Sequence, residues 1–180
     1  MITLNKLIEK KILKDSFLYE VQLDLLDEDV NYLINKIEQG IKESNYNFKT
    51  NVQGFMTPFN FFIKDEVYLK YLIQTMEFLQ NQTCDRPFGL IEAWGIKMNK
   101  KHYTRFHDHT PSEICGSLYL NDCEHSLKFP EYNLEIPLKK GTSLIFSGNL
   151  RHGADSIKND MSRYAIPFSG NYNSPWDANI

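Results

Sequence analysis

From residue 88 to residue 172 the chain consists of short apolar runs separated by polar turns, and this spacing constrains the fold more than any other feature. Runs of this length, rich in β-branched and aromatic residues, are typical of strands. Many short strands joined by regular turns predict an antiparallel barrel or a double-sheet jelly roll. The runs are GLIEAWGIKM, TRFHDH, CGSLYLN, SLKF, LEIPL, TSLIFSG and RYAIPFSGN.

The first half of the chain predicts one strand and two helices. Residues 19–25 alternate apolar and polar side chains, as a half-buried strand does. A helix is predicted from Asp27, taken as its N-cap, to about residue 41, with Gly40 near its end. A second helix is predicted over residues 65–81. The expected apolar stripes are Val30, Leu33, Ile34, Ile37 and Ile41 on the first helix, and Leu69, Leu72, Ile73, Met76 and Leu79 on the second.

We expect a single domain over residues 1–180, because no repeat, low-complexity tract or linker divides the chain. Residues 1–87 would supply a supporting strand and helices, and residues 88–172 the jelly-roll core. The expected fold class is therefore mainly β with supporting α-helices. The apolar fraction of 42% is sufficient for a folded core.

Charge, hydropathy and cysteine usage narrow the class of protein. The net charge of −3 argues against nucleic acid as a partner. No run approaches the roughly 18 apolar residues of a membrane span. The three cysteines, Cys84, Cys115 and Cys123, form no CxxC pair, which suits free thiols in a reducing compartment. We therefore expect a cytoplasmic protein.

Two histidines, His107 and His109, stand one residue apart in the run RFHDHT. In an extended strand their rings would project to the same face, while Asp108 would point away. Two imidazoles spaced in this way can hold one metal ion, and His152, after a nearly all-apolar run, is the candidate third ligand. Imidazole suits Fe, Zn, Cu and Ni, so the ligand set leaves the metal open. The alternative is that these histidines are ordinary residues of polar turns.

The remaining polar candidates are two histidines and one arginine. His102 and His125 lie in polar, turn-like segments and are expected to be plain surface residues. Arg163 lies in an alternating run and would point into the sandwich. The chain has only four arginines, and a buried guanidinium needs an anion, such as a carboxylate that it can bind with two hydrogen bonds. That carboxylate belongs either to a ligand, which the rarity of arginine favours, or to an acidic residue of the chain.

The order of HxH, a run ending in LYLN, a distal histidine and then RYAI resembles the 2-oxoglutarate- and Fe(II)-dependent oxygenases. The likeness is to the prolyl-hydroxylase-like proteins and to small phage and bacterial members, over residues 88–172. It implies a double-stranded β-helix, Fe(II) as cofactor, and 2-oxoglutarate and O2 as co-reactants. It also implies decarboxylation to succinate with hydroxylation of an unidentified small molecule or peptide, in a host cytoplasm if the chain is phage-encoded.

The family motif, HxD/E…H…R/K, transfers to this chain residue by residue. The resemblance implies that His107 and His152 are metal ligands and that Arg163 binds the far carboxylate of 2-oxoglutarate. Tyr119 matches a tyrosine that contacts the cosubstrate. Trp94 resembles a tryptophan found ahead of the motif in the small members.

The sequence departs from the family pattern at two positions. His109 stands where Asp or Glu is expected, which replaces the two-His-one-carboxylate triad with a possible three-His set. Asp108 would serve instead only if the strand bulged. Pro167 stands where prolyl hydroxylases often carry a hydroxyl residue that supports the same carboxylate, so Arg163 and Tyr119 would act there alone.

Two other readings use the same residues. HxHxxxE also resembles the first cupin motif, with His107, His109 and Glu113 as ligands of a metal-dependent dioxygenase or isomerase that ignores 2-oxoglutarate. That family does not explain Arg163 or Tyr119, and no glycine stands six residues before His107. A non-enzymatic jelly-roll binding module is the third possibility. The substrate mouth is expected at MTPFNFF and at the residues just after His109, through Glu113, whereas the substrate and the oligomeric state cannot be predicted.

Overall fold

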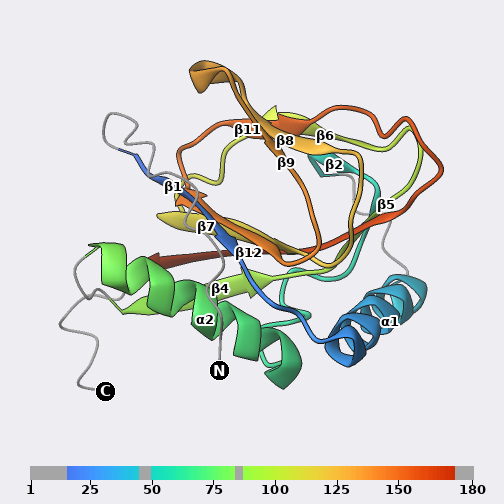
Figure 1. Cartoon of the computed structure of the whole chain (residues 1–180), viewed down its shortest axis with the longest axis horizontal. Coiled ribbons are helices and arrows are strands. Elements are labelled where there is room, and N and C mark those ends of the chain that lie inside the picture. The colour runs from blue at the N-terminus through green and yellow to red at the C-terminus, as the bar shows by residue number, and fades with distance from the viewer. Residues whose placement is uncertain (1–15, 45–49, 84–86, 173–180) are drawn as a thin grey trace.

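The computed structural model describes residues 16–44, 50–83 and 87–172 (Figure 1). Within these ranges the strands form two sheets that face each other. The larger, which we name the major sheet, contains β1 (Leu18–Gln22), β3 (Phe55–Met56), β4 (Phe88–Ala93), β5 (Ile96–Met98), β7 (Ile114–Tyr119), β10 (Thr142–Ser147) and β12 (Arg163–Tyr172). The minor sheet contains β2 (Val52–Gln53), β6 (Tyr103–His107), β8 (Ser126–Phe129), β9 (Leu134–Pro137) and β11 (His152–Ala154).

All the strand pairs among the described residues are antiparallel. The major sheet has the order β1-β10-β7-β12-β5-β3, with β4 also paired to β12, and the minor sheet has the order β2-β6-β11-β8-β9. Strands that are distant in sequence are therefore neighbours in both sheets, as in a jelly roll. A short 3-10 helix, Pro130–Tyr132, connects β8 to β9. The predicted fold class is confirmed.

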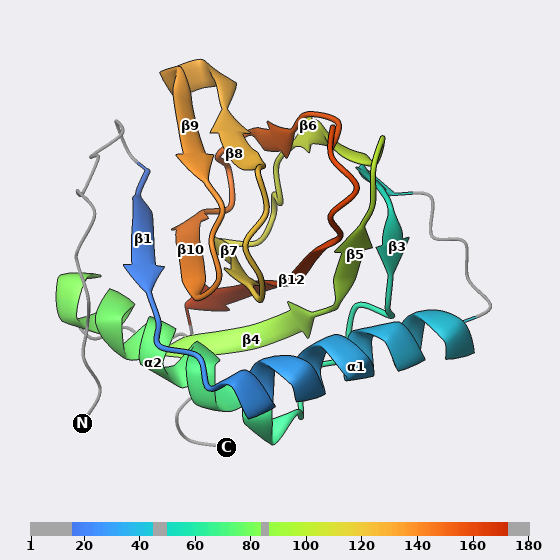
Figure 2. The same ribbon diagram turned by 45° about the vertical axis from the view of Figure 1, so that its right-hand side comes forward.

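Two helices, α1 (Asp27–Glu43) and α2 (Glu66–Thr83), lie against the major sheet on the side away from the minor sheet (Figure 2). One core cluster joins both helices to the outer face of the major sheet, and a second fills the space between the sheets. The central strands are therefore covered on both faces, and every residue of β7 and β10 is buried. This double burial explains why TSLIF reads as an apolar run rather than as an alternation.

The helices begin differently from the prediction. Asp27 is the first residue of α1, Leu26 is its N-cap, and no side chain caps the helix there. Three acidic residues in the first turn compensate, because negative charge is favourable near a helix N-terminus. In α2 the cap is Asp65, whose carboxylate accepts a hydrogen bond of 2.8 Å from the backbone N–H of Tyr68. None of the described helices is long and apolar enough to cross a membrane.

The predicted stripe of α2 was partly wrong. Ile73 is 55% exposed, and Leu69 is only partly buried. The buried face of α2 includes tyrosine and threonine side chains, which a pattern of apolar residues alone does not include. Tyr71 reaches α1 through its hydroxyl group, which accepts from the N–H of Leu26, and Thr75 donates to Ser143 at 3.1 Å. The buried residues of this face are Tyr68, Tyr71, Leu72, Thr75, Met76, Phe78 and Leu79.

Some strands also differ from the prediction. GLIEAWGIKM is interrupted at Gly95, where an added Cβ would lie 2.6 Å from the side chain of Ile37 on α1. β4 and β5 on either side of this point both pair with β12. The first strand ends at Gln22, and the short strands β2, β3 and β11 have too few residues to produce a periodic pattern. Cys115 and Cys123 are free thiols as predicted, whereas Cys84 lies outside the described residues.

Candidate active site

A cavity between the two sheets collects most of the polar residues that the sequence singled out. Its floor and walls come from β5, β7, β10 and β12 of the major sheet and from β2, β6, β8 and β11 of the minor sheet. Its polar lining is Trp94, Thr104, His107, His109, Ser117, Tyr119, His152 and Arg163. Its apolar lining is Val52, Ile96, Leu127, Phe146, Ala165 and Pro167.

The three histidines converge in this cavity. His107 on β6 and His152 on β11 are register partners, and their ring centroids lie 4.5 Å apart. The ring of His109 lies 5.0 Å from that of His107 and 5.1 Å from that of His152. One ring nitrogen of each residue lies within 4.8 Å of the others. The three residues therefore form a cluster with the composition of a metal site.

His109 enters the cluster by a route that strand periodicity did not predict. Strand β6 ends at His107, so His109 belongs to the turn that follows. Its backbone N–H donates to the carbonyl of Gly148 at 2.8 Å, and its carbonyl accepts from the N–H of Ser112 at 2.8 Å. Asp108 is exposed, and its carboxylate accepts from the N–H of Thr110 at 3.0 Å. The turn thus holds His109 inward while Asp108 points away from the cluster.

Backbone carbonyls determine the tautomer of two of the histidines. Nδ1 of His107 lies 2.8 Å from the carbonyl oxygen of Arg105, and Nδ1 of His152 lies 2.9 Å from that of Leu150. A carbonyl only accepts, so in both rings Nδ1 carries the proton and Nε2 keeps its lone pair. Second contacts of this kind orient imidazole ligands in metal sites.

Burial keeps the cluster neutral. It lowers the pKa of His109 to about 4 and that of His152 to about 3, and it lowers the pKa of His107 below its ordinary value. The neighbouring imidazoles contribute to these low pKa values of His109 and His152 as a second cause after burial. Neutral imidazole is the form that binds a metal, so the ligand atoms are available at neutral pH.

Arg163 is buried in the same cavity without an acidic partner. It is 4% exposed, and burial lowers its pKa. One terminal nitrogen donates to Nδ1 of His125 at 2.7 Å, the other contacts the sulfur of Met98, and Nε has no partner. No carboxylate of the described residues forms an ion pair with it. The salt bridge expected as an alternative is therefore not formed with any described residue, and the positive charge of the guanidinium is not neutralised by them.

Two further groups complete the lining around the histidines and Arg163. The ring of Tyr119 on β7 lies 5.9 Å from the guanidinium carbon of Arg163, and burial raises the pKa of its hydroxyl group. Trp94 is 5% exposed, its ring lies 6.3 Å from that of His109, and its indole N–H has no partner. A buried N–H without a partner costs roughly 1–3 kcal/mol, so both Trp94 and Arg163 offer donors that a polar ligand would satisfy.

The prediction for His125 was wrong. This residue is half-buried, with Nδ1 on Arg163 and Nε2 2.6 Å from the carbonyl oxygen of Asp155. Spacing along the chain could not reveal this contact, because His125 lies 38 residues from Arg163. His125 directly precedes β8 of the minor sheet, whereas Arg163 begins β12 of the major sheet. His102 is partly buried outside the cluster, where it accepts from the N–H of Asn99 at 3.0 Å.

The other candidates lie apart from the cluster. Glu113 is exposed, and its carboxylate accepts from the N–H of Tyr172 at 2.8 Å. The MTPFNFF segment does not line the cavity, but Phe59 within it packs edge-on against Trp94 at 5.1 Å. The residues from 110 to 113 do not line it either. The expected substrate mouth at these two segments stays a prediction.

Comparison with protein-family models and with curated proteins finds no match. Solved structures, in contrast, match well in fold. The viral collagen prolyl hydroxylase of Paramecium Bursaria Chlorella virus-1, in complex with 2-oxoglutarate, superposes with a TM-score of 0.67 at 18% identity, covering 84% of this chain and 94% of that one. A prolyl-4-hydroxylase of Pseudomonas putida gives 0.64 at 14% identity, covering 87% and 93%.

A third similar structure contains a different kind of bound molecule. HygX of Streptomyces hygroscopicus, with nickel, 2-oxoglutarate and hygromycin B bound, gives a TM-score of 0.64 at 11% identity, covering 87% of this chain and 83% of that one. These neighbours share an architecture with this chain at sequence identities between 11% and 18%. The chain therefore has the jelly-roll fold found in 2-oxoglutarate-dependent oxygenases.

Proposed function

We propose that this chain is a non-haem Fe(II)- and 2-oxoglutarate-dependent oxygenase. It would convert 2-oxoglutarate to succinate and CO2 while it hydroxylates a substrate that is still to be identified. The observation that carries the proposal is the shared cavity, in which three neutral imidazoles line one space with a buried arginine that has no counter-ion among the described residues. The fold of the prolyl hydroxylases and of HygX supports the same assignment.

In this proposal His107, His109 and His152 hold the iron. Two of the rings already have the correct tautomer, and burial keeps all three neutral. Bound Fe(II) would supply open positions for the 2-oxo acid and for O2. Because all three ligands are neutral, this site would leave more positive charge on the metal than a site with one carboxylate. That charge favours an anionic chelating ligand.

Arg163 and Tyr119 are the proposed cosubstrate contacts. The guanidinium supplies N–H donors and a positive charge that no described carboxylate neutralises, and a ligand carboxylate would satisfy both needs. Tyr119 adds a hydroxyl donor beside it. Apolar walls at Leu127, Phe146 and Ala165 exclude water from the same space, which strengthens electrostatic interactions there.

The alternatives receive less support. A cupin-type site would use Glu113, whose carboxylate is exposed and engaged with the backbone of Tyr172. That reading also leaves Arg163 without a role. A binding module without a metal gives no reason for three imidazoles to meet inside a cavity, with the Nε2 lone pairs of His107 and His152 unused.

The decisive experiment is an anaerobic titration. Metal-free protein receives Fe(II) and then 2-oxoglutarate, and its visible spectrum is recorded after each step. We expect a weak charge-transfer band that requires both additions. Iron binding without any response to 2-oxoglutarate would favour the cupin-type alternative. A protein that binds no metal would instead be a binding module.

A further inference from the structure

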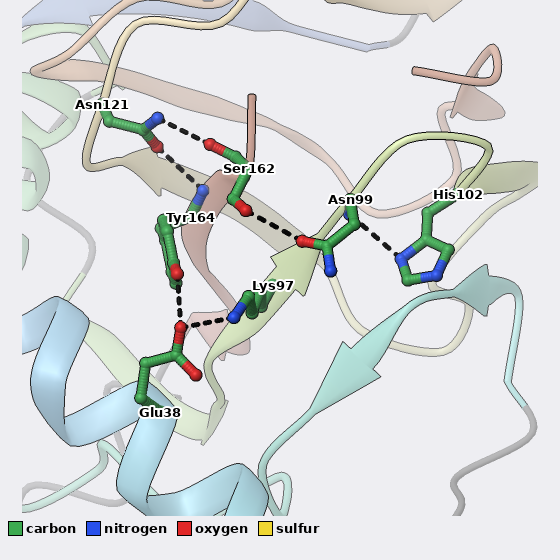
Figure 3. Close-up of polar contacts among 7 residues, drawn as sticks. All are labelled: Glu38, Lys97, Asn99, His102, Asn121, Ser162 and Tyr164. Carbon is green, nitrogen blue, oxygen red and sulfur yellow. Dashed lines mark hydrogen bonds and ion pairs between the residues drawn. The ribbon is translucent and has the colours of Figure 1, made fainter. Parts of the chain in front are cut away.

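The backbone around Arg163 is held from both sides by one residue. The side-chain amide of Asn121 donates to the carbonyl of Ser162 at 2.8 Å, and its oxygen accepts from the N–H of Tyr164 at 2.8 Å (Figure 3). A second backbone bond runs from the N–H of Leu120 to the carbonyl of Tyr164 at 3.0 Å. The start of β12 is therefore fixed at the two peptide groups that flank Arg163.

The side chains of the flanking residues are anchored on the outside. Ser162 donates from its hydroxyl group to Asn99 at 2.9 Å, and the hydroxyl group of Tyr164 donates to Glu38 on α1, which also binds Lys97 (Figure 3). With its neighbours held in this way, Arg163 points to the cavity that it lines. The backbone of Arg163 is thus fixed by these contacts, and the orientation of its long side chain depends on other residues.

His125 holds the end of that side chain. Its Nε2 donates to the carbonyl oxygen of Asp155 at 2.6 Å, which leaves Nδ1 as an acceptor for the guanidinium of Arg163 at 2.7 Å. The backbone of His125 is also fixed, by bonds to Cys123 and Leu138. The other guanidinium contact is the sulfur of Met98, a weak acceptor, so His125 is the one strong acceptor among the described residues that Arg163 reaches.

We propose that His125 is a positioning residue, which as a neutral acceptor orients the guanidinium of Arg163 for the distal carboxylate of a 2-oxo dicarboxylic acid. This inference rests on the proposed function. A neutral acceptor suits the role better than a carboxylate, because it fixes the guanidinium without neutralising the charge that the ligand needs. Pre-orientation of this kind lowers the entropy that binding must lose. Burial and the nearby Arg163 both lower the pKa of His125, which supports a neutral ring.

Two nearly isosteric variants test the role. His125→Asn keeps an acceptor near the position of Nδ1, whereas His125→Leu removes it. The Fe(II) protein is titrated without O2 with 2-oxoglutarate and with 2-oxobutyrate, which has the same chelating end and no distal carboxylate. We expect His125→Leu to weaken 2-oxoglutarate binding roughly tenfold, the scale of one hydrogen bond to a charged group. His125→Asn should stay within about twofold of the wild type, and the affinity for 2-oxobutyrate should be equal in all three proteins.

The outcomes separate the inference from the function on which it rests. Equal affinity of His125→Leu and wild type for 2-oxoglutarate, or an equal loss for both acids, overturns the positioning role alone. A wild type that does not prefer 2-oxoglutarate over 2-oxobutyrate overturns the cosubstrate assignment of Arg163 and the inference with it. If His125→Leu does not fold, nitrogen NMR of the wild type decides, because a ring with its proton on Nδ1 cannot accept from Arg163.

Discussion

His107 and His152 are register partners on adjacent antiparallel strands, and this pairing sets two of the three imidazoles on a rigid base. Their ring centroids lie 4.5 Å apart, and a backbone carbonyl orients each ring. His109 is different, because it reaches the cluster from a turn. The candidate site therefore combines two ligands of fixed position with one whose position depends on a loop, and this asymmetry makes the three residues separately testable.

The first prediction concerns metal binding. His152→Ala should abolish the binding of one Fe(II) per chain, because it removes a ligand from the rigid pair. His109→Asp should retain the metal, since it places a carboxylate, the ligand of the two-His-one-carboxylate pattern, at the same turn position. His102→Ala is the control and should bind like the wild type, because His102 lies outside the cluster. Metal content after anaerobic loading and desalting measures each case, and full retention by His152→Ala would contradict the proposed ligand set.

The second prediction concerns the turn that carries His109. A Cβ on Gly148 would lie 1.8 Å from the carbonyl oxygen of Ser112, so Gly148→Ala must displace the turn. The bond from the N–H of His109 to Gly148 would shift with it. We expect a folded protein with at least about tenfold weaker metal binding, comparable to the loss of a contact that orients a ligand. Asn149→Ala, at the exposed neighbouring position, should bind metal normally.

Sequence patterns predicted the parts of the site that depend on local order. The HxH spacing, the histidine after an apolar run and the arginine in an alternating run are all readable within a few residues. The convergence of His107 with His152 follows once both are assigned to strands of one jelly roll. Even so, His109 reaches the cluster through its turn, where the strand period no longer applies.

The parts that the sequence did not reveal depend on contacts between distant segments. His125 meets Arg163 across 38 residues, and Met98 reaches it across 65. Neither lies in a motif, so spacing carries no signal for them. The stripe of α2 was misassigned for a related reason, because Tyr71 and Thr75 are buried through polar contacts with α1 and β10 that only the packed structure contains.

The third prediction concerns pH and the metal-free protein. The pKa of His109 is about 4 and that of His152 about 3 in the folded chain, against about 6.5 when unfolded. Below pH 6.5 the unfolded chain binds protons that the folded chain does not, so the free energy of unfolding falls as the pH is lowered toward 4. His152→Asn should lessen this slope by about 1.4 kcal/mol per pH unit, the effect of one proton. Urea unfolding at pH 7, 6 and 5, with chelator present, measures it, and equal slopes would contradict the buried neutral state.

The fourth prediction separates a functional arginine from a structural one. Arg163 is a buried cation that has no carboxylate partner in the described part of the chain and whose Nε is unsatisfied, so its burial costs free energy in the ligand-free protein. Arg163→Met keeps much of the side-chain volume without the charge, and we expect the free energy of unfolding to stay equal or to rise by up to about 2 kcal/mol. The same variant should lose the stabilisation that 2-oxoglutarate gives to the Fe(II)-loaded wild type.

Urea unfolding with and without 2-oxoglutarate, under anaerobic conditions, measures both effects in one series. Arg105→Met is the matched control, because Arg105 is exposed and contributes only its backbone carbonyl to His107. It should change neither the stability nor the response to the ligand. A strongly destabilised Arg163→Met would mean that the guanidinium supports the fold through His125 and Met98. If Arg163→Met still responds to 2-oxoglutarate, the carboxylate binds elsewhere. Equal or higher stability together with loss of this response is the result expected if Arg163 serves to bind an anionic ligand.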